Sequence, residues 1–273
     1  MNTRRAIWLT LEKLRRAARE LRGGRFLRVM DVELNLRPET EFPSTWRYPL
    51  PKEHWKHRIV RYGDFVQMHA VSQAASAVAG PVLAVDVGAY HGAYAVLLGK
   101  LIGATGGRVL AIEPNPDSYA VTCENIRRNH LEDVVIVENV AVAEHSGEVL
   151  LSPASSQTQV KLSGPAGQCD LRVKCERLDV LLARHGFSRV DLLMVDVEGA
   201  ELGVLRGFPW ETMACPKLFC EIHPNDWPAF SCTGEEFAAF LKEHGLRCFD
   251  TFMEEHRSFS GSNYLGPCLL ASE

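Results

Sequence analysis

The chain has no run of the roughly 18 apolar residues that a membrane-spanning helix needs. The apolar run Ala6–Leu11 contains Thr10 and is followed by Glu12, which makes it too short for the core of a signal peptide. None of the eight cysteines forms a Cys-x-x-Cys pair, which argues against a zinc ribbon. These absences predict a cytoplasmic protein whose cysteines are reduced and lie in the core.

The chain also lacks a strong excess of positive charge. Its net charge is −4, with 46% hydrophobic and 23% charged residues, a composition that is ordinary for a globular protein. Residues 1–30 are an exception, because they carry nine Lys or Arg against two Glu and leave −11 for the remainder. We therefore expect no nucleic-acid partner for the main domain.

Two nucleotide-binding motifs are missing. The sequence contains neither the G-x-x-x-x-G-K-[ST] loop of ATP-binding proteins nor the G-x-G-x-x-G of dinucleotide-binding folds. Residues 85–94, "VDVGAYHGAY", have instead two glycines four positions apart, Gly88 and Gly92, with Tyr90 between them. A bulky ring at the position where the dinucleotide motif has its middle glycine argues against NAD.

From residue 80 onward, apolar strands alternate with helical patterns. This alternation predicts an α/β fold with a Rossmann-like, mainly parallel sheet and helices on both faces. We expect a cofactor-binding domain at 80–273 and an N-terminal extension at 1–79. The predicted strands are 82–87, 108–112, 134–137, 190–197 and 218–222, with short β segments at 147–152, 160–163 and 171–175, and a terminal antiparallel pair at 248–252 and 267–271; the predicted helices are 92–102, 117–129, 178–185 and 234–245.

The extension begins with a basic amphipathic helix. Ile7, Leu11, Leu14, Ala18 and Leu21 repeat at helical spacing, and arginines and lysines cover much of the remaining surface. Such a helix can pack on its own domain or on a second subunit, and it can also contact an anionic membrane surface or a nucleic acid. Residues 38–62, rich in Pro and aromatic residues, either line the mouth of the site or form a surface linker.

In an open parallel sheet, ligands bind at the carboxyl ends of the strands, where the strand order reverses. The turn at Gly88 and Gly92 follows the first such strand, and its glycines allow the backbone to approach a ligand closely. Asp86 lies at the end of that strand, and Glu113 ends the next one, where a carboxylate can accept hydrogen bonds from ribose hydroxyls. This set is compatible with S-adenosylmethionine (SAM).

Further carboxylates follow the fourth and fifth strands. We expect Asp196 and Glu198 to lie on one face of the strand 190–197 and to point into the same cleft. Glu221 and His223 repeat this spacing on the next strand, and an imidazole that titrates near neutrality suits a general base. We name Asp196, Glu198 and His223 as the catalytic candidates.

Two alternatives to this assignment stay open. The acids could only cap the following helix, in whose first turn we expect Glu201 to favour the helix dipole. Asp196, Glu221 and His223 could also hold a divalent metal, but we assign no metal site.

Four segments together resemble the FkbM-type family of SAM-dependent methyltransferases. They are "DVGAYHGAY" at 86–94, "AIEPNP" at 111–116, "DLLMVDVEGAE" at 191–201 and "FCEIH" at 219–223. The resemblance covers about residues 80–224, and it implies a class I, seven-stranded Rossmann-like fold. It also implies O-methylation of a hydroxyl on a sugar, glycan, lipid-linked or polyketide-type acceptor.

The resemblance further implies a set of cofactor-binding residues. The turn would hold the methionine part of SAM, Glu113 its ribose, and the segment after the third strand its adenine. The residues are Asp86, Gly88, Ala89, Tyr90, Gly92, Glu113, Pro114, Asn139, Val140 and Ala141. Tyr90 departs from the family, which usually has Asn at this position.

Two other classes of function remain open from the sequence. One is another nucleoside-cofactor enzyme on the same layout, such as an oxidoreductase. The other is a non-catalytic SAM-fold module that binds a partner through its basic helix.

Overall fold

The structure is a computed structural model that describes residues 26–29, 32–35, 70–152, 159–161, 171–250, 254–259 and 266–272. The predicted basic helix and the Pro- and aromatic-rich segment 38–62 lie outside these residues. Within the extension, β1 (Phe26–Val29) and β2 (Val32–Asn35) pair in antiparallel orientation. The helical residues 70–76 contribute Val71 and Ala75 to one of the two cores that flank the main sheet. The boundary near residue 80 stays a prediction.

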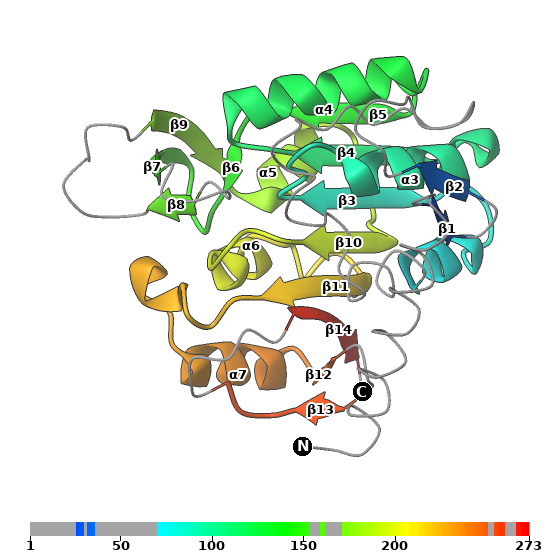
Figure 1. The fold of residues 1–273 in the computed structure, drawn as a ribbon. Helices are drawn as coiled ribbons and strands as arrows, with labels where there is room; N and C mark the ends of the chain where they lie inside the picture. The colour runs from blue at the N-terminus through cyan, green and yellow to red at the C-terminus, as the bar shows by residue number, and fades with distance from the viewer. Residues whose placement is uncertain are drawn as a thin grey trace, which may run out of the picture.

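The main sheet has the predicted α/β topology (Figure 1). Its strand order is β13-β12-β14-β11-β10-β3-β4-β5, and the five strands from β11 to β5 are parallel. The strands are β3 (Leu83–Val87), β4 (Arg108–Ile112), β5 (Val135–Glu138), β10 (Leu192–Val195), β11 (Lys217–Ile222), β12 (Leu246–Phe249), β13 (Glu255–His256) and β14 (Gly266–Ser272). The two-residue β13 is the strand beyond the expected seven. The terminal antiparallel pair is confirmed, because β14 runs antiparallel to both β11 and β12.

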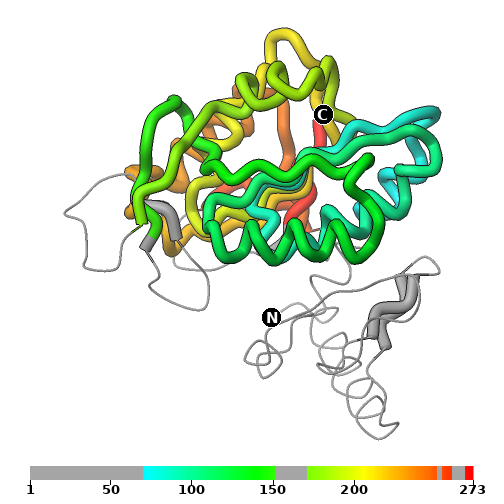
Figure 2. The backbone as a smooth tube through the Cα atoms, turned by 90° about the horizontal axis from the view of Figure 1, so that it is seen from above, coloured from blue at the N-terminus to red at the C-terminus, as the bar shows by residue number. Residues whose placement is uncertain are grey.

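Alternate residues of the central strands face opposite layers of helices. Val85 and Leu193 face the core that contains α5 (Leu178–Arg184), α6 (Glu201–Arg206) and α7 (Gly234–Glu243). Ala84 faces the core that contains α3 (Ala93–Ile102) and α4 (Pro116–Arg128). Figure 2 shows these layers from above, on opposite sides of the sheet. Since both faces are covered, the strands are continuous apolar runs, as the sequence predicted.

The short β segments form a second sheet of their own. Its order is β6-β9-β7-β8, with β6 (Ala141–Val142), β7 (Gly147–Ser152), β8 (Gln159–Lys161) and β9 (Leu171–Glu176). It has a small core that includes Val149, Leu151 and Cys175. In Figure 1 it lies at the end of the main sheet toward which β3 and β4 point. This is the end where ligands bind in such folds.

The strand order reverses between β3 and β10. From β3 the chain continues to β4 and β5 on one side, and it then returns to β10 and β11 on the other. Beyond β3, Gly88 has a φ of +85°, and a Cβ there would lie 1.7 Å from the backbone oxygen of Asp196. Only glycine therefore allows the segments after β3 and β10 to pack this closely.

We expect Gly88→Ala to destabilise the domain strongly. The left-handed conformation alone costs an alanine about 1–2 kcal/mol, and the overlap with Asp196 adds to that. Gly186→Ala is the matched control, because Gly186 has a φ of +70° and a Cβ there would meet no atom within 4 Å. Denaturant unfolding of both variants measures the difference, and equal losses would contradict the close packing at Gly88.

Candidate active site

The turn after β3 has an unusual backbone. Gly88, Tyr90 and Gly92 have φ values of +85°, +50° and +79°, and Gly92 is the N-cap of α3. Tyr90 adopts this conformation without being a glycine, and its ring stacks on His91 with centroids 3.7 Å apart. Its carbonyl oxygen accepts a hydrogen bond of 2.7 Å from Thr122 Oγ1. A left-handed backbone is uncommon for Tyr, so the surrounding contacts must hold Tyr90 in this conformation.

Glu113 connects this turn to the end of β4. The residue is 6% exposed, and its Oε2 accepts a hydrogen bond from the backbone N–H of Tyr90 at 2.7 Å. Its Oε1 accepts one from the backbone N–H of Asn115 at 2.8 Å. Burial raises the pKa of Glu113 to about 7 in spite of these two donors. Each carboxylate oxygen keeps a further lone pair, so Glu113 can still accept from a ligand hydroxyl.

The end of β5 completes the predicted cofactor surface. Asn139 Nδ2 donates to the carbonyl oxygens of Glu113 and Pro114, at 2.9 and 3.0 Å. Val140 is buried, and Ala141 begins β6. The predicted cofactor residues thus lie together at the carboxyl ends of β3, β4 and β5.

Asp86 supplies an acceptor without a partner. It is 3% exposed, and its Oδ2 has no hydrogen-bond partner among the described residues. Burial and the nearby Asp196 carboxylate raise the pKa of Asp86 to about 7, against a smaller opposing effect of the Ala95 backbone N–H. Buried acids with raised pKa values favour a cationic ligand, because a positive charge would stabilise their ionised forms. Asp86, Glu113 and the glycine turn therefore fit SAM, which combines a sulfonium with a ribose.

The catalytic candidates meet around one imidazole nitrogen. His223 Nε2 lies 3.5 Å from Glu198 Oε2 and 3.9 Å from Asp196 Oδ1. The structure corrects the reason for this meeting, because β10 ends at Val195, Asp196 follows the strand directly and Glu198 lies in the turn after it. Glu198 has a φ of +52° there, so this turn, and not strand alternation, brings the two carboxylates to the same side. Glu221 Oε1 lies 3.9 Å from the same nitrogen.

The other ring nitrogen of His223 has a partner that the sequence analysis missed. Nδ1 lies 2.8 Å from Glu201 Oε1, and the Glu201 side chain is 0% exposed. Glu201 also accepts hydrogen bonds from the Gly199 backbone N–H at 2.9 Å and from Trp227 Nε1 at 2.7 Å. Glu201 begins α6 as expected, and its carboxylate also binds these groups outside the helix.

The charge state of His223 differs from the expectation. Burial alone would lower the pKa of His223, but the hydrogen bond and charge of Glu201, and then the charges of Glu198 and Asp196, raise it to about 10. The prediction that His223 titrates near neutrality is therefore wrong for the protein without ligands. At pH 7 the ring is an imidazolium held among carboxylates.

A divalent cation could use part of the same group. Asp196, Glu221 and His223 each offer one ligand atom, and these atoms lie within 4.8 Å of one another. Carboxylate oxygen and imidazole nitrogen are suitable ligands for several divalent metals. The site can therefore act through a base or through a metal, and the two differ in their response to a chelator.

Residues 86–248 match the family model of the Methyltransferase FkbM domain. The chain belongs to this family. It is 28% identical over 142 residues to the hexuronic acid methyltransferase AglP of Haloferax volcanii, a match that covers 50% of this chain and 54% of that protein. It is also 29% identical over 104 residues to the AMB antimetabolite synthetase AmbE of Pseudomonas aeruginosa, covering 38% of this chain and 5% of that protein.

Among solved structures, the Methyltransferase FkbM of Methylobacillus flagellatus aligns with a TM-score of 0.47 at 16% identity, covering 80% of this chain and 50% of that one. The chain thus spans about half the length of the first curated relative and a small part of the second. Among the described residues, no helix is long and apolar enough to cross a membrane.

The buried Asp86 carboxyl makes stability depend on pH. Its pKa rises from 3.8 to about 7 on folding, so its contribution to stability is complete below pH 3.8 and is lost as the pH rises toward about 7. Asp86→Asn keeps an oxygen acceptor for the Ala95 N–H but cannot ionise. We expect the melting temperature of the ligand-free variant to decline less between pH 4 and pH 7 than that of the parent. Glu148→Gln, at an exposed acid, is the control, and equal slopes in all three proteins would refute the prediction.

Proposed function

We propose that this chain transfers a methyl group from SAM to a hydroxyl of a small-molecule or glycan acceptor. The observation that carries the proposal is the pair formed by His223 and Glu201 beside the strand-order reversal. The buried Glu201 carboxylate lies 2.8 Å from His223 Nδ1, and the other ring nitrogen, Nε2, faces Asp196 and Glu198. A base held by a carboxylate is a recurring arrangement for removing a proton from a poor nucleophile.

The proposed roles follow the geometry of the site. SAM, when bound, supplies a methyl group on a positively charged sulfur. The turn from Gly88 to Gly92 would bind its amino-acid part, Glu113 would accept from its ribose, and Asn139–Ala141 would border its base. Asp86 and Asp196 give the cleft the negative potential that favours a cation.

His223 would accept the hydroxyl proton of the acceptor at Nε2. Asp196 and Glu198 would then stabilise the imidazolium that forms, since both lie within 4 Å of that nitrogen. In the free protein this nitrogen carries a proton at neutral pH. A cation bound beside Asp196 offsets the negative charge that raises the pKa of His223, and so it favours the neutral ring that a base requires.

The acceptor is proposed as a hydroxyl on a sugar-like, lipid-linked or polyketide-type molecule. AglP is described as a hexuronic acid methyltransferase, which supports a sugar-type acceptor. The methyltransferase domain is proposed to span residues 80–273. The basic extension, residues 1–79, is proposed to contact a second subunit or a membrane surface, and its charge pattern is the support. The free cysteines, most of them buried, support a reducing compartment such as the cytoplasm.

Glu113→Ala should weaken SAM binding about tenfold to a hundredfold. The variant leaves ribose hydroxyls without an acceptor, at a cost of about 1–3 kcal/mol. Calorimetric titration with SAM measures the affinity, and circular dichroism checks the fold, because Glu113 also binds two backbone N–H groups of the turn. Asp117→Ala removes an exposed acid four residues away and should bind normally. Parent-like affinity in a folded Glu113→Ala protein would exclude the ribose role.

His223→Ala should lower turnover by about 10²–10⁴-fold while SAM affinity stays near normal. Asp196→Asn should lower it less, because Glu198 still lies near Nε2 and can stabilise the imidazolium that forms. His145→Ala, at an exposed histidine, is the control. Screening hydroxyl acceptors with radiolabelled SAM gives the turnover.

Two outcomes would change the proposal. Near-normal turnover in both variants would rule out this group as the catalytic site, and SAM binding without turnover on any acceptor would favour a non-catalytic module. Activity that a chelator abolishes and magnesium restores would replace the base by a metal held by Asp196, Glu221 and His223.

A further inference from the structure

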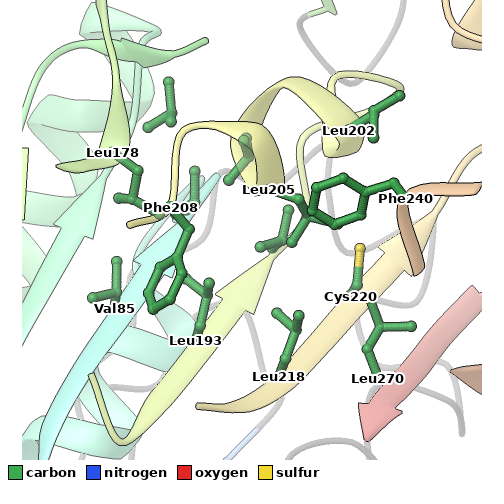
Figure 3. Packing of buried hydrophobic residues seen from close by; sticks show 14 of the residues in the cluster. Val85, Leu178, Leu193, Leu202, Leu205, Phe208, Leu218, Cys220, Phe240 and Leu270 are labelled. Atoms are coloured by element: carbon green, nitrogen blue, oxygen red, sulfur yellow. The ribbon is translucent and has the colours of Figure 1, made fainter. Parts of the chain in front are cut away.

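Helix α4 buries a polar face. Of its four buried residues only Ile126 is apolar, and the others are Ser118, Thr122 and Asn125. The helices on the opposite face of the sheet bury apolar side chains instead, such as Leu205 of α6 (Figure 3). Burying a polar side chain costs free energy unless it gains a hydrogen-bond partner. The polar face of α4 therefore needs partners, and two of them lie in the turn after β3.

Thr122 and Asn125 bind consecutive carbonyl groups of that turn. Thr122 Oγ1 donates to the carbonyl oxygen of Tyr90, and Asn125 Nδ2 donates to that of His91, both at 2.7 Å. The two side chains are each 0% exposed. A Cβ at Gly92 would lie 2.8 Å from Thr122 Cγ2, so the helix packs directly against the turn. Helix α4 thus holds the turn from the side of its carbonyl oxygens.

These contacts also fix how the N–H groups of the turn point. The carbonyl and the following N–H of a trans peptide point in opposite directions, so the bond from Thr122 to the Tyr90 carbonyl turns the His91 N–H away from α4. Glu113 accepts from the Tyr90 N–H at 2.7 Å. Tyr90 has a φ of +50°, which a tyrosine rarely adopts, so its conformation depends on such contacts.

The Asn125 amide is not fully paired. Its Oδ1 is buried and has no hydrogen-bond partner among the described residues. A buried acceptor without a partner destabilises a fold. Stability alone therefore does not account for an amide at this position, and we attribute its presence to the bond that it donates to the His91 carbonyl.

We propose that Thr122 and Asn125 are positioning residues that hold the turn in the form that binds the amino-acid part of SAM. The inference rests on the function proposed above. When only a fraction of a protein is in its binding-competent form, its apparent affinity falls by that fraction. Loss of either contact lets the turn leave its left-handed form. It should therefore weaken a ligand that needs the turn and spare a ligand that does not.

Thr122→Val removes the hydroxyl and keeps the branched shape of the side chain. Calorimetry compares S-adenosylhomocysteine with methylthioadenosine, a second adenosine thioether that lacks the amino-acid part. We expect Thr122→Val to weaken S-adenosylhomocysteine about threefold to tenfold and methylthioadenosine by less than about twofold. Thr122→Ser keeps the hydroxyl and should restore most of the affinity.

Asn125→Ala is the second variant, and it decides the case if Thr122→Val does not fold. It should change the two affinities in the same way. Asn129→Ala is its matched control, because Asn129 is a buried residue at the C-cap of α4 whose Nδ2 donates at 2.9 Å to the Asn125 carbonyl oxygen, within the helix itself. This control should bind both thioethers as the parent does.

Amide hydrogen exchange of the ligand-free protein measures the turn directly. In Thr122→Val and Asn125→Ala, residues 88–92 should exchange about threefold to tenfold faster than in the parent, while β10 exchanges at the parent rate. Parent-like exchange of the turn in the folded variants would overturn the inference, and so would an equal weakening of both thioethers. A parent that binds neither thioether would overturn the proposed function instead, and the exchange rates would still decide whether α4 holds the turn.

Discussion

The site depends on a concentration of acidic side chains, several of which are buried. Asp86, Glu113 and Glu201 are each no more than 6% exposed, and Asp196, Glu198 and Glu221 lie near the same edge of the sheet. Removing a carboxylate from water is costly unless donors or cations replace the lost solvation. At the ends of β4 and β10, backbone N–H groups supply such donors to Glu113 and Glu201.

Two of the acids are stabilised by the backbone that they organise. Glu113 binds the N–H groups of Tyr90 and Asn115, which joins the turn after β3 to the segment after β4. Glu201 binds the N–H of Gly199, in a turn where a Cβ at that glycine would lie 2.7 Å from Asp226. Since these bonds fix left-handed residues on both sides of the strand-order reversal, the carboxylates are structural elements of the cleft as well as potential ligands.

The sequence predicted the elements better than the contacts between them. Runs such as 108–112 and 218–222 are apolar because helices cover both faces of the sheet, so their positions could be predicted closely. Glu201 and His223 lie 22 positions apart on different elements. A hydrophobic pattern along the sequence cannot predict a contact between two such residues. The charge state of His223 was predicted wrongly for the same reason, because it depends on how many carboxylates the fold gathers around one ring.

The turn after β10 shows what could not be predicted from the sequence. An apolar run that ends in Asp196 and Glu198 indicates acids at the cleft, but alternation on a strand was the wrong reason, since the strand ends at Val195. The left-handed Glu198 and Gly199 reverse the chain, and this reversal also brings Glu201 back beneath His223. A short motif therefore encodes both the acids that face the ligand side of the imidazole and the acid that holds its opposite nitrogen.

The same charges order the events of the proposed reaction. With the cleft free of ligand, four carboxylates within 4 Å hold a proton on His223, so the ring cannot accept a further proton at neutral pH. A sulfonium beside Asp86 and Asp196 would offset part of that negative charge and weaken the hold on the proton. On the proposed function, cofactor binding would bring the methyl group and would also allow His223 to lose its proton and act as the base. The hydroxyl acceptor would then gain a competent base only after the cofactor is in place, because in the ligand-free cleft the carboxylates hold the proton on His223.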